Sequence, residues 1–217
     1  MLQQILTLFR KEVLLEYRMS YAISGILLYV FSTVFVVYNA LAKPDALVWN
    51  TIFWIIILFI AVNAIVKSFV QESGTRQIYY YTLASPLAVF IAKLVFNVLL
   101  LFVLSIIAYV VLAFFVGNPV KDLGGFISAI MLSSVGFSIV FTFISGISAK
   151  ANNSATLLTI LAFPLNIPTL LTLLKLSAAS LRLFMDTSTN TDILILVAID
   201  LLLFALAIVL FPFVWRD

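Results

Sequence analysis

Hydrophobic residues along this chain form long uninterrupted runs that alternate with shorter polar stretches. Six runs reach the roughly 20 residues that a helix needs to cross the hydrocarbon core of a bilayer. They cover residues 21–41, 47–66, 94–116, 126–149, 155–174 and 193–215. The runs are continuous, whereas the strands of a membrane barrel alternate apolar and polar positions. The pattern therefore predicts one all-α transmembrane domain, residues 1–217, with six membrane-spanning helices.

The first 18 residues have a different pattern, in which apolar side chains recur at helical spacing. These side chains are Leu2, Ile5, Leu6, Phe9 and Val13, with Gln3, Thr7, Arg10 and Lys11 largely on the other side. The pattern is typical of an amphipathic helix that lies in the membrane interface. A cytoplasmic extension of the first span is the alternative. A signal peptide is not indicated, because the charges follow the first apolar residues and no small-residue cleavage site comes after them.

A polar and aromatic stretch separates the second and third predicted spans, at residues 68–92. Its polar and ring-bearing side chains are Glu72, Arg76, Gln77, Tyr79, Tyr80 and Tyr81. Gly74 interrupts the preceding helix, and Pro86 suits the first turn of a new one. The stretch is long for a simple connection, since helix–helix links commonly have 2–8 residues. It is either a loop with interfacial tyrosines or a short helix that docks into a partner.

The charge distribution predicts the orientation of the spans. The chain is 65% hydrophobic and 10% charged, so the bilayer must solvate most of its surface. An even number of spans places both termini on one side, and basic residues favour the cytoplasm. With the termini inside, eight basic residues are cytoplasmic: Arg10, Lys11, Arg18, Lys67, Arg76, Lys93, Lys150 and Arg216. Four lie outside: Lys43, Lys121, Lys175 and Arg182. The pI near 9.2 therefore indicates membrane orientation and no nucleic-acid partner.

Several residue types and motifs are absent, and their absence limits the chemistry. The chain has no cysteine and no histidine, which removes thiolate metal sites, the commonest metal ligand and a Ser-His hydrolase. No G-x-x-x-x-G-K-[ST] sequence is present to bind a nucleotide through a P-loop. We therefore predict no catalytic residue and no metal site, and any ATP hydrolysis would belong to a partner.

Two features inside the spans are candidates for function. Asp200 is the only acidic residue within a predicted span, and intramembrane acids are usually functional. Its structural alternative is an interhelical hydrogen bond. Pro164 and Pro168 flank Asn166 in the fifth span, where each proline frees a backbone carbonyl and tends to kink the helix. They form either a flexion point near a dimer axis or ordinary prolines whose freed backbone groups neighbouring helices satisfy.

Three segments of the chain resemble the heme exporter protein B family. The stretch between spans two and three is similar to that family's first cytoplasmic loop through Glu72, Gly74, Pro86 and the Ala92-Lys93 pair. The sequence FPLNIPTLL, residues 163–171, resembles its fifth span. LFRKEVLLEYR, residues 8–18, resembles its amphipathic start through Phe9, Arg10, Glu12 and Arg18. Residues 77–81, QIYYY, depart from the family, which has acidic and leucine residues there.

The resemblance implies an ABC-2 type permease whose cytoplasmic loop is a coupling helix that docks on an ATPase. Its expected partners are the ATPase subunit, a second copy of itself, a heme-handling membrane protein, a small single-span subunit and membrane lipids. It implies a bacterial cytoplasmic (inner) membrane location and a role in heme export, or in release of a heme-loaded periplasmic chaperone, for cytochrome c maturation. We expect no directly bound cofactor, because partners would handle heme and ATP.

Other functions remain open from the sequence. An ABC-2 permease for a lipid, a polysaccharide or a drug would have the same architecture. A non-transporting membrane scaffold is a further alternative, and a channel would need a polar pore that these spans barely provide.

Overall fold

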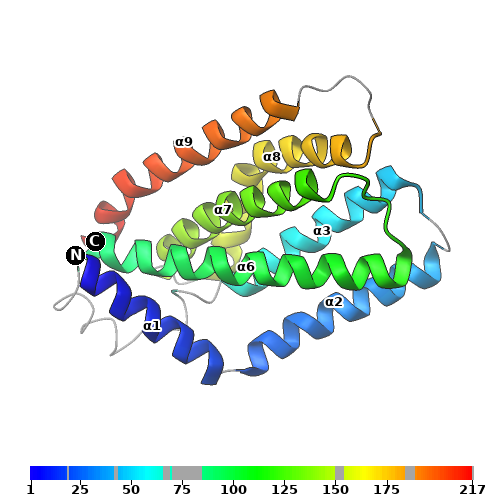
Figure 1. The fold of residues 1–217 in the computed structure, drawn as a ribbon. Coiled ribbons are helices and arrows are strands. Elements are labelled where there is room, and N and C mark those ends of the chain that lie inside the picture. Colours follow the sequence, from blue (N-terminus) through cyan, green and yellow to red (C-terminus); the bar gives the residue numbers. More distant parts are fainter. Residues whose placement is uncertain are drawn as a thin grey trace.

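A computed structural model describes residues 1–18, 20–41, 44–65, 69, 85–149, 154–183 and 189–216. These parts of the chain form seven helices and no strand (Figure 1). The helices are α1 Leu2–Arg18, α2 Ser20–Ala40, α3 Ala46–Ile65, α6 Pro86–Val116, α7 Leu123–Ser148, α8 Ser154–Ser180 and α9 Thr189–Arg216. The start of α1 and the end of α9 lie at the same end of the bundle (Figure 1).

Six of the described helices, α2 to α9, are long and apolar enough to cross a membrane, which confirms the six expected spans. The largest difference from the expected bounds is in α6, which begins at Pro86 and not near Leu94. Its 31 residues extend about 46 Å at 1.5 Å per residue, whereas the hydrocarbon core is about 30 Å thick. The first turns of α6 therefore extend beyond the hydrocarbon core.

The α7 helix is the centre of the bundle and packs against α6, α8 and α9. Two-thirds of its membrane-spanning window is buried, compared with 17% for α2 and for α9. Gly136 and Gly146 explain part of this close approach, because a methyl group at Gly146 would lie 2.8 Å from the Phe211 ring of α9. These two glycines thus allow close helix packing in the fourth span.

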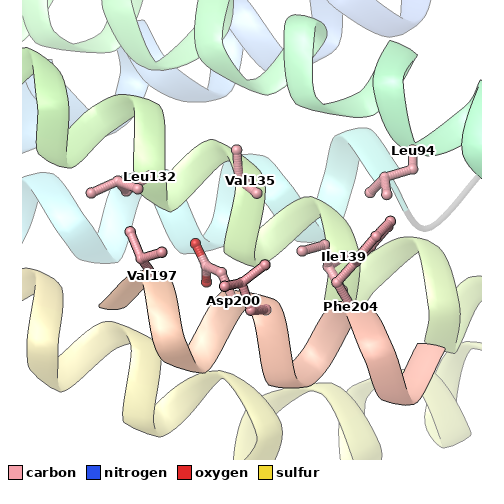
Figure 2. Close-up of a pocket in the computed structure, with 8 residues that line it drawn as sticks. Leu94, Leu132, Val135, Ile139, Val197, Asp200 and Phe204 are labelled. Carbon is pink, nitrogen blue, oxygen red and sulfur yellow. The ribbon is translucent and has the colours of Figure 1, made fainter. Parts of the chain in front are cut away.

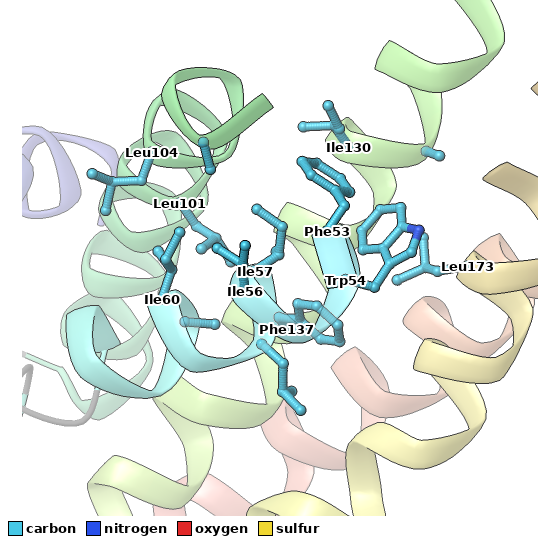
Figure 3. Packing of buried hydrophobic residues seen from close by; sticks show 14 of the residues in the cluster. Phe53, Trp54, Ile56, Ile57, Ile60, Leu101, Leu104, Ile130, Phe137 and Leu173 are labelled. Carbon is cyan, nitrogen blue, oxygen red and sulfur yellow. The ribbon is translucent and has the colours of Figure 1, made fainter. Parts of the chain in front are cut away.

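The main hydrophobic core forms around α3, where its side chains meet those of α6, α7 and α8 (Figure 3). Trp49 and Phe53 stack with their ring centroids 5.7 Å apart, and Phe126 of α7 lies 5.1 Å from Phe53. The indole N–H of Trp54 donates to the Ser177 hydroxyl of α8 at 2.7 Å. A buried indole N–H is stabilised by such an acceptor, so this hydrogen bond fixes α3 against α8.

The connection between α6 and α7 is tied to the end of α8. The backbone N–H groups of Lys121 and Asp122 both donate to the Ser180 carbonyl, at 3.2 and 3.0 Å. Asp122 is also the N-cap of α7, and its carboxylate accepts from the Gly125 N–H at 3.2 Å. These bonds satisfy backbone groups that have no hydrogen-bond partner within their own helix. They also join the end of α8 to the start of α7.

Candidate functional site

The predicted docking segment, residues 72–81, lies outside the described residues. It contains Glu72, Gly74, Arg76, Gln77, Tyr79, Tyr80 and Tyr81, so the structure does not place the expected coupling helix. The structure describes residues on both sides of this segment. Phe69 lies just before it and Pro86 just after it.

Pro86 occupies the first turn of α6, as the sequence predicts. Ser85 is the N-cap, with φ −70° and ψ 142°, and its carbonyl accepts from the N–H groups of Ala88 and Val89. Proline suits this place because its missing N–H would have no helical partner there. Residues 86–92, expected to belong to the polar loop, are therefore the first two turns of a membrane-spanning helix.

Lys93 forms a buried ion pair that the sequence does not predict. Its Nζ lies 3.0 Å from the Glu12 carboxylate of α1, and its side chain is only 2% exposed. The same ammonium lies 4.9 Å from the centroid of the Phe69 ring, a distance that suits a cation–π contact. Lys93 therefore links α1, α6 and the residue that precedes the docking segment.

The face of α1 that packs on the bundle includes Ile5 and Phe9 of the predicted apolar face but not its other three residues. Leu2, Leu6 and Val13 are 76%, 60% and 43% exposed. The half-buried face instead carries Ile5, Leu8, Phe9, Glu12 and Leu15. Phe9 meets Phe96 of α6 edge to face at 6.4 Å, whereas Arg10 and Arg18 are exposed. By helical spacing, Glu12 lies on the same face as Ile5 and Phe9. A carboxylate among apolar neighbours could have indicated from the sequence that Glu12 has a buried basic partner.

A second hydrophobic cluster surrounds the two ends of the docking segment. Its rings are close together, with Phe211 of α9 at 4.8 Å from Phe90 and 5.6 Å from Phe69. The Phe69 N–H donates to the Ser145 hydroxyl of α7 at 3.2 Å. Both described flanks of the segment are thus packed against α7 and α9.

The prolines of the fifth span lie within α8, which continues as a helix through both of them. Pro164 and Pro168 are exposed, whereas Asn166 is only 1% exposed and faces the bundle. The Asn166 amide donates to the Ala162 carbonyl at 2.8 Å, within the same helix. The structure therefore brings Asn166 to the interior and leaves the two prolines on an outer face.

Asp200 of α9 is buried at 5% exposure against α7. A methyl group added to Gly136 would collide with its carboxylate, so the acid fits only because α7 has no side chain there. Neither carboxylate oxygen has a hydrogen-bond partner among the described residues. The interhelical hydrogen bond expected as the structural role of Asp200 is therefore not present in the described part of the chain. The nearby Thr169 hydroxyl also lacks a partner there.

The model of one family matches residues 3–215 of this chain, and the family is described as CcmB protein. The chain belongs to the CcmB family. It is thus a permease subunit of the heme exporter system that serves cytochrome c maturation, as its resemblance to heme exporter protein B implies. CcmB proteins are membrane subunits of ABC-type complexes and not a family of catalytic enzymes. No match was found among curated proteins.

Proposed function

We propose that this CcmB chain couples ATP hydrolysis by a separate ATPase subunit to heme export, or to release of a heme-loaded periplasmic chaperone. The observation that carries this proposal is the Lys93 ion pair at the base of the docking segment. Lys93 is 2% exposed and contacts both Glu12 and Phe69. A displacement of the segment by an ATPase would therefore reach α1 and α6 together.

The packing around this ion pair supports force transmission into the membrane. Phe69, Phe90 and Phe211 come from both flanks of the segment and from α9, and close-packed side chains transmit strain. Residues 72–81 would form the docking surface, with Glu72, Gly74, Arg76, Gln77 and Tyr79–Tyr81 as its contacts and Pro86 as its rigid end.

The proposed partners beyond the ATPase are a second copy of the chain, a heme-handling membrane protein and a small single-span subunit. The protein would sit in the bacterial inner membrane with both termini in the cytoplasm. The shared position of the two chain ends supports an even number of crossings (Figure 1). Heme iron would be held by a partner, so the purified chain should show no stoichiometric Soret band.

The decisive test is ATPase activity after co-reconstitution with the ATPase subunit in lipid vesicles. We expect the chain to bind the ATPase and to change its rate, and Arg76→Ala with Tyr80→Ala to abolish the change. Tyr17→Ala is the matched control, because Tyr17 is a tyrosine on α1 that is 84% exposed.

Two outcomes, one from this experiment and one from a strain that lacks the chain, would separate this function from its alternatives. Binding without any change of rate would contradict coupling and favour a membrane scaffold. Coupling that is intact while cytochrome c maturation proceeds normally without the chain would favour a permease for another substrate, such as a lipid, a polysaccharide or a drug.

A further inference from the structure

One side of α1 packs on the bundle, and another side is exposed with a pattern of its own. Leu2, Leu6 and Val13, the three residues of the predicted apolar face that the bundle does not use, are exposed. At 3.6 residues per turn, these side chains lie within about 40° of one another around the helix. They form an apolar stripe that the described residues leave uncovered.

This apolar stripe lies between the bundle and a polar side of α1. Phe9, which meets Phe96 of α6 edge to face, adjoins the stripe on one side. Arg10 adjoins it on the other, and Thr7 lies beyond Arg10; both are exposed. A helix that lies at a membrane surface beside a bundle meets protein, acyl chains, headgroups and water in the same order.

The charges of α1 are divided in a similar way. Its two acids, Glu12 and Glu16, lie on the half-buried side that packs on the bundle. Lys11 is paired with Glu12 at 2.9 Å, whereas Arg10 and Arg18 are exposed. The exposed surface of α1 therefore carries positive charge and no acidic side chain, and it complements an anionic lipid surface.

The contacts of α1 place it near a membrane surface. Figure 1 shows α1 beside the start of α6, at the end of the bundle where both chain ends lie. Its partners there, Lys93 and Phe96, are about 10 and 15 Å from Pro86, the first residue of α6. The α6 helix is about 16 Å longer than the hydrocarbon core is thick. The α1 helix therefore packs on α6 close to the boundary between hydrocarbon and headgroups.

We propose that α1 binds anionic phospholipid in the membrane leaflet beside it. The apolar stripe inserts among the acyl chains, and Arg10 and Arg18 bind the lipid phosphates. A neutral lipid would suit the stripe equally well, so the arginines provide the preference for an anionic headgroup. Each arginine near an anionic surface should strengthen binding about fivefold.

The first measurement locates the stripe relative to the bilayer. Because the chain has no cysteine, Leu6→Cys, Thr7→Cys and Leu201→Cys each accept a single spin label. The labelled chain is placed in nanodiscs of equimolar phosphatidylcholine and phosphatidylglycerol. Collisions with oxygen, which concentrates in the bilayer, are then compared with collisions with a nickel chelate, which stays in water.

Leu201 is the reference for full immersion in the bilayer. It is 62% exposed in the middle of α9 and lines the apolar cavity between α6, α7 and α9 (Figure 2). We expect the Leu6 label to resemble the Leu201 label. The Thr7 label, about 100° further around α1, should instead meet the nickel chelate. Equal water exposure of the two α1 labels would overturn the proposal. Shielding of the Leu6 label from both reagents would also overturn it, because a second copy of the chain would then cover the stripe.

The second measurement tests the headgroup preference. Native mass spectrometry of the full chain in mild detergent gives the affinity for the first phosphatidylglycerol or phosphatidylcholine molecule bound. Arg10→Gln together with Arg18→Gln should weaken phosphatidylglycerol binding by about fivefold for each arginine and leave phosphatidylcholine binding unchanged.

Two controls separate the arginines from the overall charge of the chain. Replacing both arginines by lysine keeps the charge and should keep the preference. Lys121→Gln removes an exposed cation from the α6–α7 connection, at the opposite end of the bundle, and should have no effect (Figure 1). An equal loss in Lys121→Gln, or no loss in the double glutamine variant, would overturn the proposal.

Discussion

Glu12 and Lys93 form an ion pair whose side chains are only 12% and 2% exposed. Burying two charges is costly, and the pair offsets that cost only while both members are present. Lys11 also contacts Glu12 at 2.9 Å, so this one carboxylate serves two ammonium groups. Removing Glu12 therefore affects more than a single contact.

We predict that Glu12→Gln lowers the free energy of unfolding by about 3 kcal/mol, because Lys93 stays buried without its carboxylate. Denaturant unfolding of the purified chain in detergent micelles measures this loss. The double variant with Lys93→Gln should be more stable than Glu12→Gln alone. Arg10→Gln is the control and should be neutral, because Arg10 is exposed on the same helix. Wild-type stability of Glu12→Gln would show that the pair contributes nothing.

Gly136 is a position where the packing of α7 against α9 leaves no room for a side chain. A Cβ there would collide with the Asp200 carboxylate and lie 3.1 Å from Thr169. We predict that Gly136→Ala destabilises the chain by about 1–3 kcal/mol, the usual range for overpacking. Asp200→Ala should recover most of that loss in the double variant, since it removes the colliding atoms.

A glycine in an open part of the bundle is the control for this prediction. Gly25 lies in α2, and a Cβ added there would meet no atom within 4 Å. Gly25→Ala should be neutral or slightly stabilising, because alanine favours the helix. An equal effect of the two substitutions on unfolding would mean that helix propensity, and not the contact with Asp200, explains Gly136.

The helices show which parts of the fold the sequence specifies. The bilayer sets a minimum length for each apolar run, so the six spans follow from composition and continuity. The start of α6 follows only in part. Pro86 suits a first helical turn, but the charge of Lys93 interrupts the apolar run until its partner Glu12 is known. Similarly, the predicted apolar face of α1 includes Ile5 and Phe9, but only the structure shows that Leu8, Glu12 and Leu15 lie on its half-buried face.

Substitution of the prolines of α8 tests whether this helix bends during the transport cycle. Replacing Pro164 and Pro168 by alanine restores two backbone N–H donors and should stiffen the helix. We predict normal protein levels and a several-fold loss of cytochrome c maturation, measured by heme staining of c-type cytochromes. The control is Pro212→Ala, which changes a proline inside α9 and should leave maturation near the wild-type level. Full maturation in the double alanine variant would exclude a flexion role.

The bundle as a whole has its chain ends together and its interhelical loops divided between two ends (Figure 1). The loop at Lys121 and the ion pair between Lys175 and Asp192, at 3.5 Å, belong to the end opposite the start of α1. Asp192 is in the first turn of α9, where the helix dipole favours an acid. The basic residues of α1 would then mark the cytoplasmic end.

Cysteine labelling tests this orientation directly, because the chain has no cysteine of its own. Arg10→Cys in α1 and Lys121→Cys in the α6–α7 connection each introduce one thiol at an exposed position, and the start of α1 and this connection lie at opposite ends of the bundle (Figure 1). A membrane-impermeant maleimide added to spheroplasts should label Lys121→Cys and should reach Arg10→Cys only after lysis. The reverse pattern would place the docking segment outside the cytoplasm, where no ATP-hydrolysing subunit could reach it, and the proposed coupling would then be impossible.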